Sequence, residues 1–164
     1  MSKENNAKLN SMPEEKRGAI KAFVDGTCDN ISKMTREQKE SMITICYQQL
    51  EPELREIDVN EFNCASYSEF LCQIVLAAAA VDKEFSLEEE ETVDEVMKTV
   101  GLLGQPFEED INKIEAIDLD LSKLSKKLKP TSRAMFLTFV SIIFLSDKEL
   151  NDDEFDMMID ILEP

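Results

Sequence analysis

Acidic side chains recur at matching positions in two short segments of the chain, and they are the residues best suited to chemistry. Segment 82–89 has Asp, Glu and Glu at its first, third and eighth positions, and segment 147–154 has the same three. Carboxylate oxygens are hard donors, so they favour Ca²⁺, Mg²⁺ or Mn²⁺ over zinc. The candidate metal ligands are Asp82, Glu84, Glu89, Asp147, Glu149 and Glu154.

The spacing of these acids excludes an ordinary EF-hand. That loop needs Gly at its sixth position and Glu at its twelfth. Counted from the Asp that opens each segment, these positions hold Leu87 and Val93, and then Asp152 and Met158. Neither segment therefore has the residues that close an EF-hand loop.

Helix capping explains part of the acidic pattern. Ser86-x-x-Glu89 and Asn151-x-x-Glu154 are capping-box sequences, in which the first side chain accepts from a backbone N–H and the Glu reaches back to the cap. Each motif predicts that a helix begins directly after the capping residue. The first two acids of each segment have no such structural role.

The acidic segments follow two apolar stretches of the same phase, which indicates an internal repeat. Residues 70–80, opened by a capping box at 66–69, are apolar nearly all round, as are residues 134–145, opened by Thr131 after Pro130. Each acidic segment is followed by an amphipathic pattern. We therefore predict an all-α helical bundle with an internal pseudo-twofold repeat, whose two apolar helices pack on each other at the centre.

The first sixty residues carry further helix signals. Residues 11–14 read as a capping box, and residues 25–27 are expected to end the first helix. Residues 35–38 form another box, and that helix is expected to end before Pro52. The expected parts are a mobile tail at 1–10, N-terminal helices at 11–60 and a core domain at 61–164, with 11–164 forming one compact domain.

A short helix is also predicted from the spacing of Leu121, Leu124 and Leu128, after an extended link at 117–121. This stretch carries the one basic cluster of the sequence. The cluster is interpreted either as a solvated face or as a patch for a partner. Its members are Lys123, Lys126, Lys127 and Lys129.

Composition limits the classes of function. The formal net charge is −17, which repels phosphate backbones and argues against nucleic-acid binding. It attracts cations and basic protein surfaces, or serves solubility alone. Histidine is absent, which excludes Ser-His and Cys-His catalysis and His-containing zinc sites. Four cysteines without C-x-x-C, and apolar runs too short to span a bilayer, predict a reduced cytoplasmic protein without a transmembrane segment. The oligomeric state stays open.

At the two acidic segments the sequence resembles the tellurite-resistance TerB-like family. Residues 79–89 and 145–154 are similar to that family's paired acidic loops, and residues 117–121 to its middle segment. The resemblance covers about residues 62–164. It implies an all-helical, pseudo-twofold, non-enzymatic domain that binds divalent metal and acts in stress-response or phage-defence assemblies near the membrane. The conserved acids of the family fall on Asp82, Glu89, Asp147 and Glu154.

Two lysines depart from the family pattern. Lys83 and Lys148 stand where the family often has Gly, and an ammonium group there offsets carboxylate repulsion without any metal. We slightly favour this metal-free interpretation of the loops and keep the other open. The expected function is a non-catalytic acidic module that acts in stress response by binding a divalent cation, a protein partner or both through the two loops. The alternatives are a metal-free adaptor for a basic partner and a carboxylate–metal hydrolase.

Overall fold

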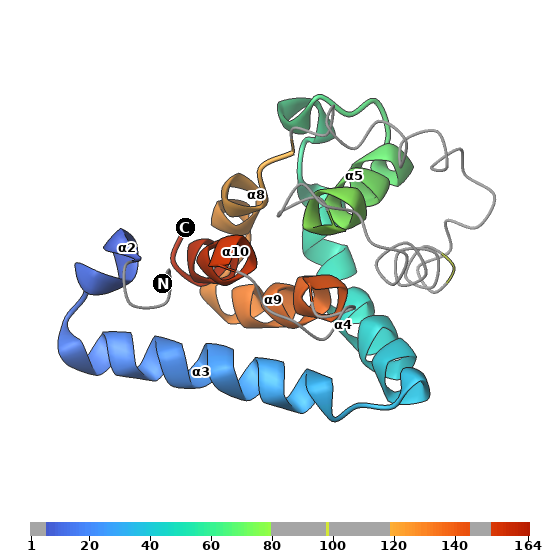
Figure 1. The fold of residues 1–164 in the computed structure, drawn as a ribbon. Coiled ribbons are helices and arrows are strands. Elements are labelled where there is room, and N and C mark those ends of the chain that lie inside the picture. The colour runs from blue at the N-terminus through green and yellow to red at the C-terminus, as the bar shows by residue number, and fades with distance from the viewer. Residues whose placement is uncertain (1–5, 80–97, 99–118, 145–151) are drawn as a thin grey trace.

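A computed structural model describes residues 6–79, 98, 119–144 and 152–164, and Figure 1 shows how they are arranged. Within these residues the chain is helical and has no strand, as predicted. The elements are α2 (Ala7–Asn10), α3 (Glu14–Ser32), α4 (Arg36–Glu56), the 3-10 helix η1 (Val59–Phe62), α5 (Tyr67–Ala79), α8 (Leu121–Lys127), α9 (Pro130–Phe144) and α10 (Asp152–Leu162).

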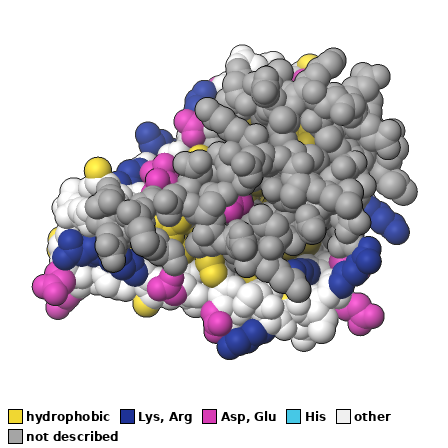
Figure 2. All heavy atoms as spheres, in the orientation of Figure 1, with side chains coloured by type: hydrophobic (Ala, Val, Ile, Leu, Met, Phe, Trp, Pro, Cys, Tyr) yellow, Lys and Arg dark blue, Asp and Glu magenta, His cyan; other side chains and the backbone are white. Residues whose placement is uncertain are grey.

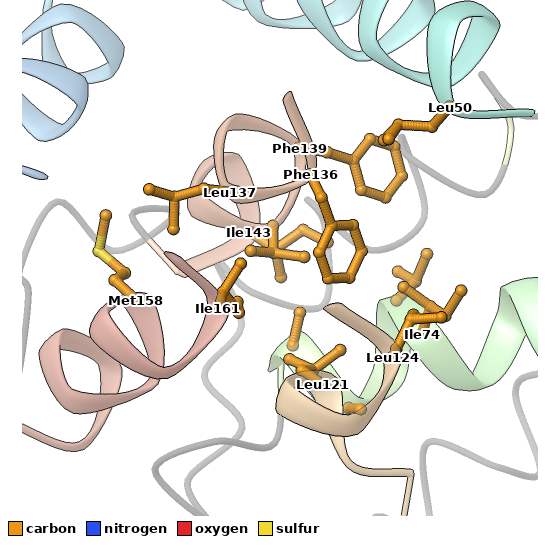
Figure 3. Close-up of a cluster of buried hydrophobic side chains, with 14 of the residues drawn as sticks. Leu50, Ile74, Leu121, Leu124, Phe136, Leu137, Phe139, Ile143, Met158 and Ile161 are labelled. Carbon is orange, nitrogen blue, oxygen red and sulfur yellow. The ribbon is translucent and has the colours of Figure 1, made fainter. Parts of the chain in front are cut away.

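Helix α9 lies at the centre of the described core and contacts α3, α4, α5 and α10. Its side chains reach several neighbours: Phe139 points toward Leu50 of α4, and Phe136 points toward Ile74 of α5 (Figure 3). Phe136 is 1% exposed. The apolar faces of α5 and α9 are buried and the two helices are in contact, so the predicted central pair is confirmed for the described residues.

Helix α10 is amphipathic, as the sequence predicts, and packs on α8 and α9. Phe155, Met158 and Ile159 are at most 2% exposed. The join with α8 also has a polar contact, because the buried hydroxyl of Ser125 donates to the carbonyl oxygen of Ile161. α8 itself begins at Leu121, where the Asp120 side chain caps it, so the extended link ends before this residue.

Residues 6–10 do not form the expected mobile tail. They include α2, and Leu9 is 0% exposed. Asn6 Nδ2 donates to Asp156 Oδ1 of α10 at 2.7 Å, and Lys8 Nζ donates to the Glu163 carbonyl at 2.7 Å. One buried leucine and two polar contacts therefore fasten this end of the chain beside α10 (Figure 1). In the sequence, Ala7 and Leu9 are the two apolar residues of this segment, which is too few to predict a packed helix.

The first long helix differs from its prediction at both ends. Ser11 does not cap this helix: it is the C-cap residue of α2, where its hydroxyl donates to the Lys8 carbonyl. α3 starts after Pro13 with no side-chain cap bond. The helix also continues through Gly26 to Ser32. Ile31 is buried beyond that glycine, and burying it offsets the roughly 1 kcal/mol that Gly costs a helix.

The predicted start of helix α4 is confirmed, whereas its predicted end is wrong. Thr35 Oγ1 accepts from the Gln38 N–H at 3.2 Å, and Gln38 Oε1 accepts from the Thr35 N–H at 2.8 Å. Pro52 lies inside the helix instead of beyond it. Leu54, on the far side of Pro52, is 2% exposed, and its burial stabilises a last turn that the proline alone would disfavour.

The capping box predicted at residues 66–69 is present at the start of α5, with one of its two hydrogen bonds changed. Ser66 Oγ accepts from the Glu69 N–H at 3.1 Å, while the Glu69 carboxylate accepts from Ala65 N–H at 2.8 Å instead of from the cap residue itself. Helix α9 begins at Pro130, one residue before the predicted opening at Thr131, because proline suits the first turn of a helix.

Candidate functional site

One of the six candidate metal ligands lies within the described residues. Glu154 sits in the first turn of α10 and is 2% exposed, and it takes part in an interaction. A carboxylate this deeply buried needs a polar or charged partner to be tolerated. The other five candidates lie outside the described residues: Asp82, Glu84, Glu89, Asp147 and Glu149.

The second acidic segment is held between two buried helices. α9 ends at Phe144, α10 begins at Asp152, and the two helices contact each other. α10 thus begins directly after Asn151, where the capping motif places its start. Asn151 and Ser86, the two predicted caps, lie outside the described residues. Among residues 6–79, 98, 119–144 and 152–164, no three His, Cys, Asp or Glu side chains converge as a metal site.

The basic cluster lies on and just after α8, and three of its lysines approach acids from a distant part of the sequence. Lys123 Nζ donates to the Glu61 carbonyl at 2.8 Å. Lys127 Nζ lies 2.7 Å from Glu61 Oε2, and Lys129 Nζ lies 4.0 Å from Glu53 Oε1. The lysines are exposed, yet they also join α8 to the end of α4 and to η1.

A groove of about 390 Å³ lies at this junction, and we call it the α4–α8 groove. Glu53, one of the residues at the groove, has a buried carboxylate oxygen, Oε2, without a hydrogen-bond partner among the described residues. The Glu53 side chain as a whole is 18% exposed. The groove is lined by Glu53, Glu56, Ile57, Asp58, Glu61, Lys127 and Lys129.

Two tyrosines and two charged residues form a network at the join of α4 and α5. Tyr47 O–H donates to Glu51 Oε2 at 2.9 Å and lies 3.0 Å from the Tyr67 hydroxyl. Arg55 Nη2 donates to the same Glu51 oxygen at 3.0 Å, and its guanidinium lies 4.2 Å from the centre of the Tyr67 ring. The four-residue spacing along α4 was visible in the sequence, whereas the pairing with Tyr67 depends on the fold.

This network shifts the acidity of its members. Burial, together with hydrogen bonds to Tyr67 and Glu51, raises the pKa of Tyr47 far above its ordinary value. Burial also raises the pKa of Tyr67. The hydrogen bonds from Tyr47 and Arg55 lower the pKa of Glu51. Both phenols therefore stay protonated at neutral pH, and the network acts as a structural clamp between α4 and α5.

The cysteines behave as small core residues where the structure describes them. None of the four is in a disulfide, and Cys46, Cys64 and Cys72 are buried. Burial raises the pKa of Cys46 to about 11, which keeps this thiol protonated and unreactive at neutral pH.

A second hollow of about 800 Å³ lies where α3 meets α4. Its apolar lining comes from Met34, Met42 and Ile45, and Ile45 is 46% exposed. Thr35 and Gln38 also line it, but their side chains are used in the cap of α4. Asn30, Lys33, Glu37 and Ser41 complete the lining, so the hollow has a mixed polar and apolar surface.

Comparison with known proteins adds no family assignment. No protein-family model, curated protein or solved structure matches the chain. In the described part of the chain, no helix combines the length and apolar character that a bilayer crossing requires.

Proposed function

We propose that this chain is a non-catalytic acidic binding module that acts in stress response, as its resemblance to the TerB-like family implies. It binds a divalent cation, a basic protein partner or both through the two acidic loops. Four cysteines without a disulfide accord with the reducing cytoplasm in which we place it.

The observation that carries this proposal is the position of the negative charge. Segment 82–95 contains eight acids and one lysine, and segment 147–156 contains six acids and one lysine. These segments therefore hold twelve of the seventeen surplus negative charges. By contrast, the nineteen residues of α3 carry four acids and three basic residues. Figure 2 shows both signs interspersed along the edge formed by α3.

The anchoring of the second segment supports the same proposal. The first described residues on either side of it belong to α9 and α10, which pack together in the core. A binding segment flanked by two packed helices requires less ordering of its neighbours on binding than one in a free tail.

Calorimetric titration of the full chain with CaCl₂, MgCl₂ and MnCl₂ tests the metal arm of the proposal. If a cation binds the loops, Asp147→Asn abolishes the heat, whereas Glu40→Gln on the exposed side of α4 leaves it unchanged. If the lysines already neutralise the loops, the wild type gives no heat and Lys83→Gly gains it.

The metal-free adaptor is the second candidate, and the two lysines within the acidic segments favour it. Absence of heat from both wild type and Lys83→Gly with all three ions would remove metal from the account. The adaptor then predicts that a basic peptide binds the wild type, and that Asp82→Asn combined with Asp147→Asn weakens this binding.

A further inference from the structure

We infer that two copies of this chain pair through α3 and the start of α4, and that each copy places its Phe23 ring in the α3–α4 hollow of the other. The inference concerns residues outside the two acidic segments, so it is independent of the proposed function. It rests on exposed apolar side chains, on the hollow beside them and on the local balance of charge. We call this surface the α3–α4 face, and it is formed by Phe23, Gly26, Asn30, Met42 and Ile45.

The α3–α4 face holds the large apolar side chains that are exposed among the described residues. These are Phe23 of α3 and Ile45 of α4, which are 42% and 46% exposed. Helix α3 runs along the edge of the molecule, and its C-terminal end leads into α4 (Figure 1). Burying these two side chains against another apolar surface would remove them from water and stabilise a complex.

The hollow of about 800 Å³ continues this surface, and Asn30, Met42 and Ile45 are among the residues that line it. Phe23 stands seven positions before Asn30. In a helix this spacing is two turns along the same side, or about 10 Å. Each copy therefore presents, on one side of α3, both an exposed aromatic ring and a hollow that can receive one.

The balance of charge favours a second copy over a strongly basic or acidic partner. Residues 14–45 contain six acids and six basic residues, so this part of the chain has no net charge. The other residues carry the whole formal charge of −17. Two copies therefore repel each other over most of their surfaces and least at the α3–α4 face. A strongly charged partner gains no electrostatic attraction there.

A two-fold axis would join the ring of each copy to the hollow of the other. If the two α3 helices cross antiparallel between residues 26 and 27, residue 23 of each copy lies opposite residue 30 of the other. Such a contact is isologous and closes as a dimer. Gly26 then stands at the crossing point. A Cβ added there would meet nothing within 4 Å, so the two backbones can approach closely.

The pair is expected to be weak and to depend on salt. The face is small and includes polar side chains, which places Kd on the order of 10–100 μM. Single chains are therefore the main species at about 1 μM. Salt screens the repulsion between the remaining acidic surfaces, so association should strengthen about threefold or more between about 0.05 M and about 0.5 M NaCl.

Sedimentation velocity of the full chain, from about 1 μM to about 300 μM, measures the association. Phe23→Ala is expected to weaken it about tenfold, because it removes the ring that the hollow receives. Ser32→Ala is the matched control. Ser32 is exposed and lies nine positions after Phe23, on the opposite side of α3, so its truncation should change the affinity less than about twofold.

Two glycines of α3 separate association from folding. Gly26→Gln and Gly18→Gln each place a better helix former in open space, so both should raise the melting temperature at about 1 μM by about 2–4 °C. Only Gly26→Gln puts a side chain at the crossing point, so it alone should weaken association, by about tenfold or more. An effect on the helix itself would act alike in both variants.

Each contrary result overturns the inference. A chain that stays monomeric at about 300 μM has no second copy on this face. Equal effects of Phe23→Ala and Ser32→Ala, or of Gly26→Gln and Gly18→Gln on association, place the contact elsewhere. Assemblies that grow beyond a dimer contradict the two-fold geometry. Association that weakens with salt shows that opposite charges, such as those of the basic cluster and the acidic segments, join the copies instead.

Discussion

The hydrophobic core around α9 and the α4–α8 groove are held together by different interactions. Around α9, apolar side chains from four other helices are buried together, as Figure 3 shows for Leu50, Ile74 and Met158. In the groove, exposed lysines approach carboxylates that lie more than sixty residues earlier in the sequence. The comparison indicates that apolar burial around α9 holds the fold together, while the exposed ion pairs of the groove contribute little stability.

The largest effect on stability is expected from truncating a buried side chain at the centre of the core. Phe136→Ala removes a ring that is 1% exposed, and it should lower the free energy of unfolding by about 3–5 kcal/mol. Phe23→Ala is the matched control, because that ring is 42% exposed. Urea denaturation of both variants checks this, and similar losses would show that α9 is not the centre of stability.

The next largest effect is expected at the N-terminal end. Leu9→Ala should cost about 2–4 kcal/mol, since this side chain is fully buried beside the core. Ser11→Ala should cost far less, because its hydroxyl is exposed and bonds only to a carbonyl within the same turn. If Leu9→Ala melts like the wild type, residues 6–10 are the mobile tail that the sequence suggested.

A smaller loss is expected from the tyrosine network. Tyr47→Phe removes the hydroxyl that contacts both Glu51 and Tyr67, which should cost about 1–2 kcal/mol. Thr44→Ala is a control from the same helix, because its hydroxyl contacts only the Glu40 carbonyl. Denaturation that leaves Tyr47→Phe and Thr44→Ala indistinguishable would show that the network is not a clamp.

The same network gives a pH dependence with a defined sign. Because folding raises the pKa of both tyrosines, their contribution to stability is fully present below about pH 10 and is lost as pH rises through the folded pKa values. The chain has two tyrosines and no tryptophan, so absorbance at alkaline pH reports them alone. Tyrosinate formation in the folded chain near pH 10, as in the unfolded chain, would contradict the buried network.

The smallest effect is expected in the groove. Lys127→Ala breaks an ion pair whose two side chains are 42% and 44% exposed, so the cost should stay below about 1 kcal/mol and fall with added salt. Lys126→Ala provides the baseline for removing a lysine from α8. A loss above about 2 kcal/mol that salt does not reduce would make the groove part of the structural core.

Local patterns predicted the parts of the molecule that local forces govern. The apolar phase of residues 70–80 and 134–145 identified the central helices, and the box at Thr35 identified the start of α4. The predicted ends at Gly26 and Pro52 were wrong, because burial of side chains beyond them outweighed the local preference. Propensity acts on one residue, whereas burial depends on the whole fold.

The groove could not be predicted in the same way. Lys127 and Lys129 belong to the basic cluster that was visible in the sequence. No sequence pattern indicated that their partners are Glu61 and Glu53. Charged pairs between distant segments leave no periodic pattern in the sequence, so these partners follow only from the way that α8 packs near η1 and α4. For the acidic loops the sequence supplied the candidate residues and, through Glu154 at the start of α10, one buried position that the structure describes.

The central claim is that the two acidic loops form the binding surface, and a shift in thermal stability tests it most directly. Wild type and the Asp82→Asn, Asp147→Asn variant are melted alone, with millimolar Ca²⁺, Mg²⁺ or Mn²⁺, and with a short peptide of alternating Lys and Gly. We predict that at least one of these stabilises the wild type, by about 2.7 kcal/mol at a hundredfold excess over Kd, and that the variant loses this gain. No shift with any of them, or the same shift in both proteins, would contradict the account.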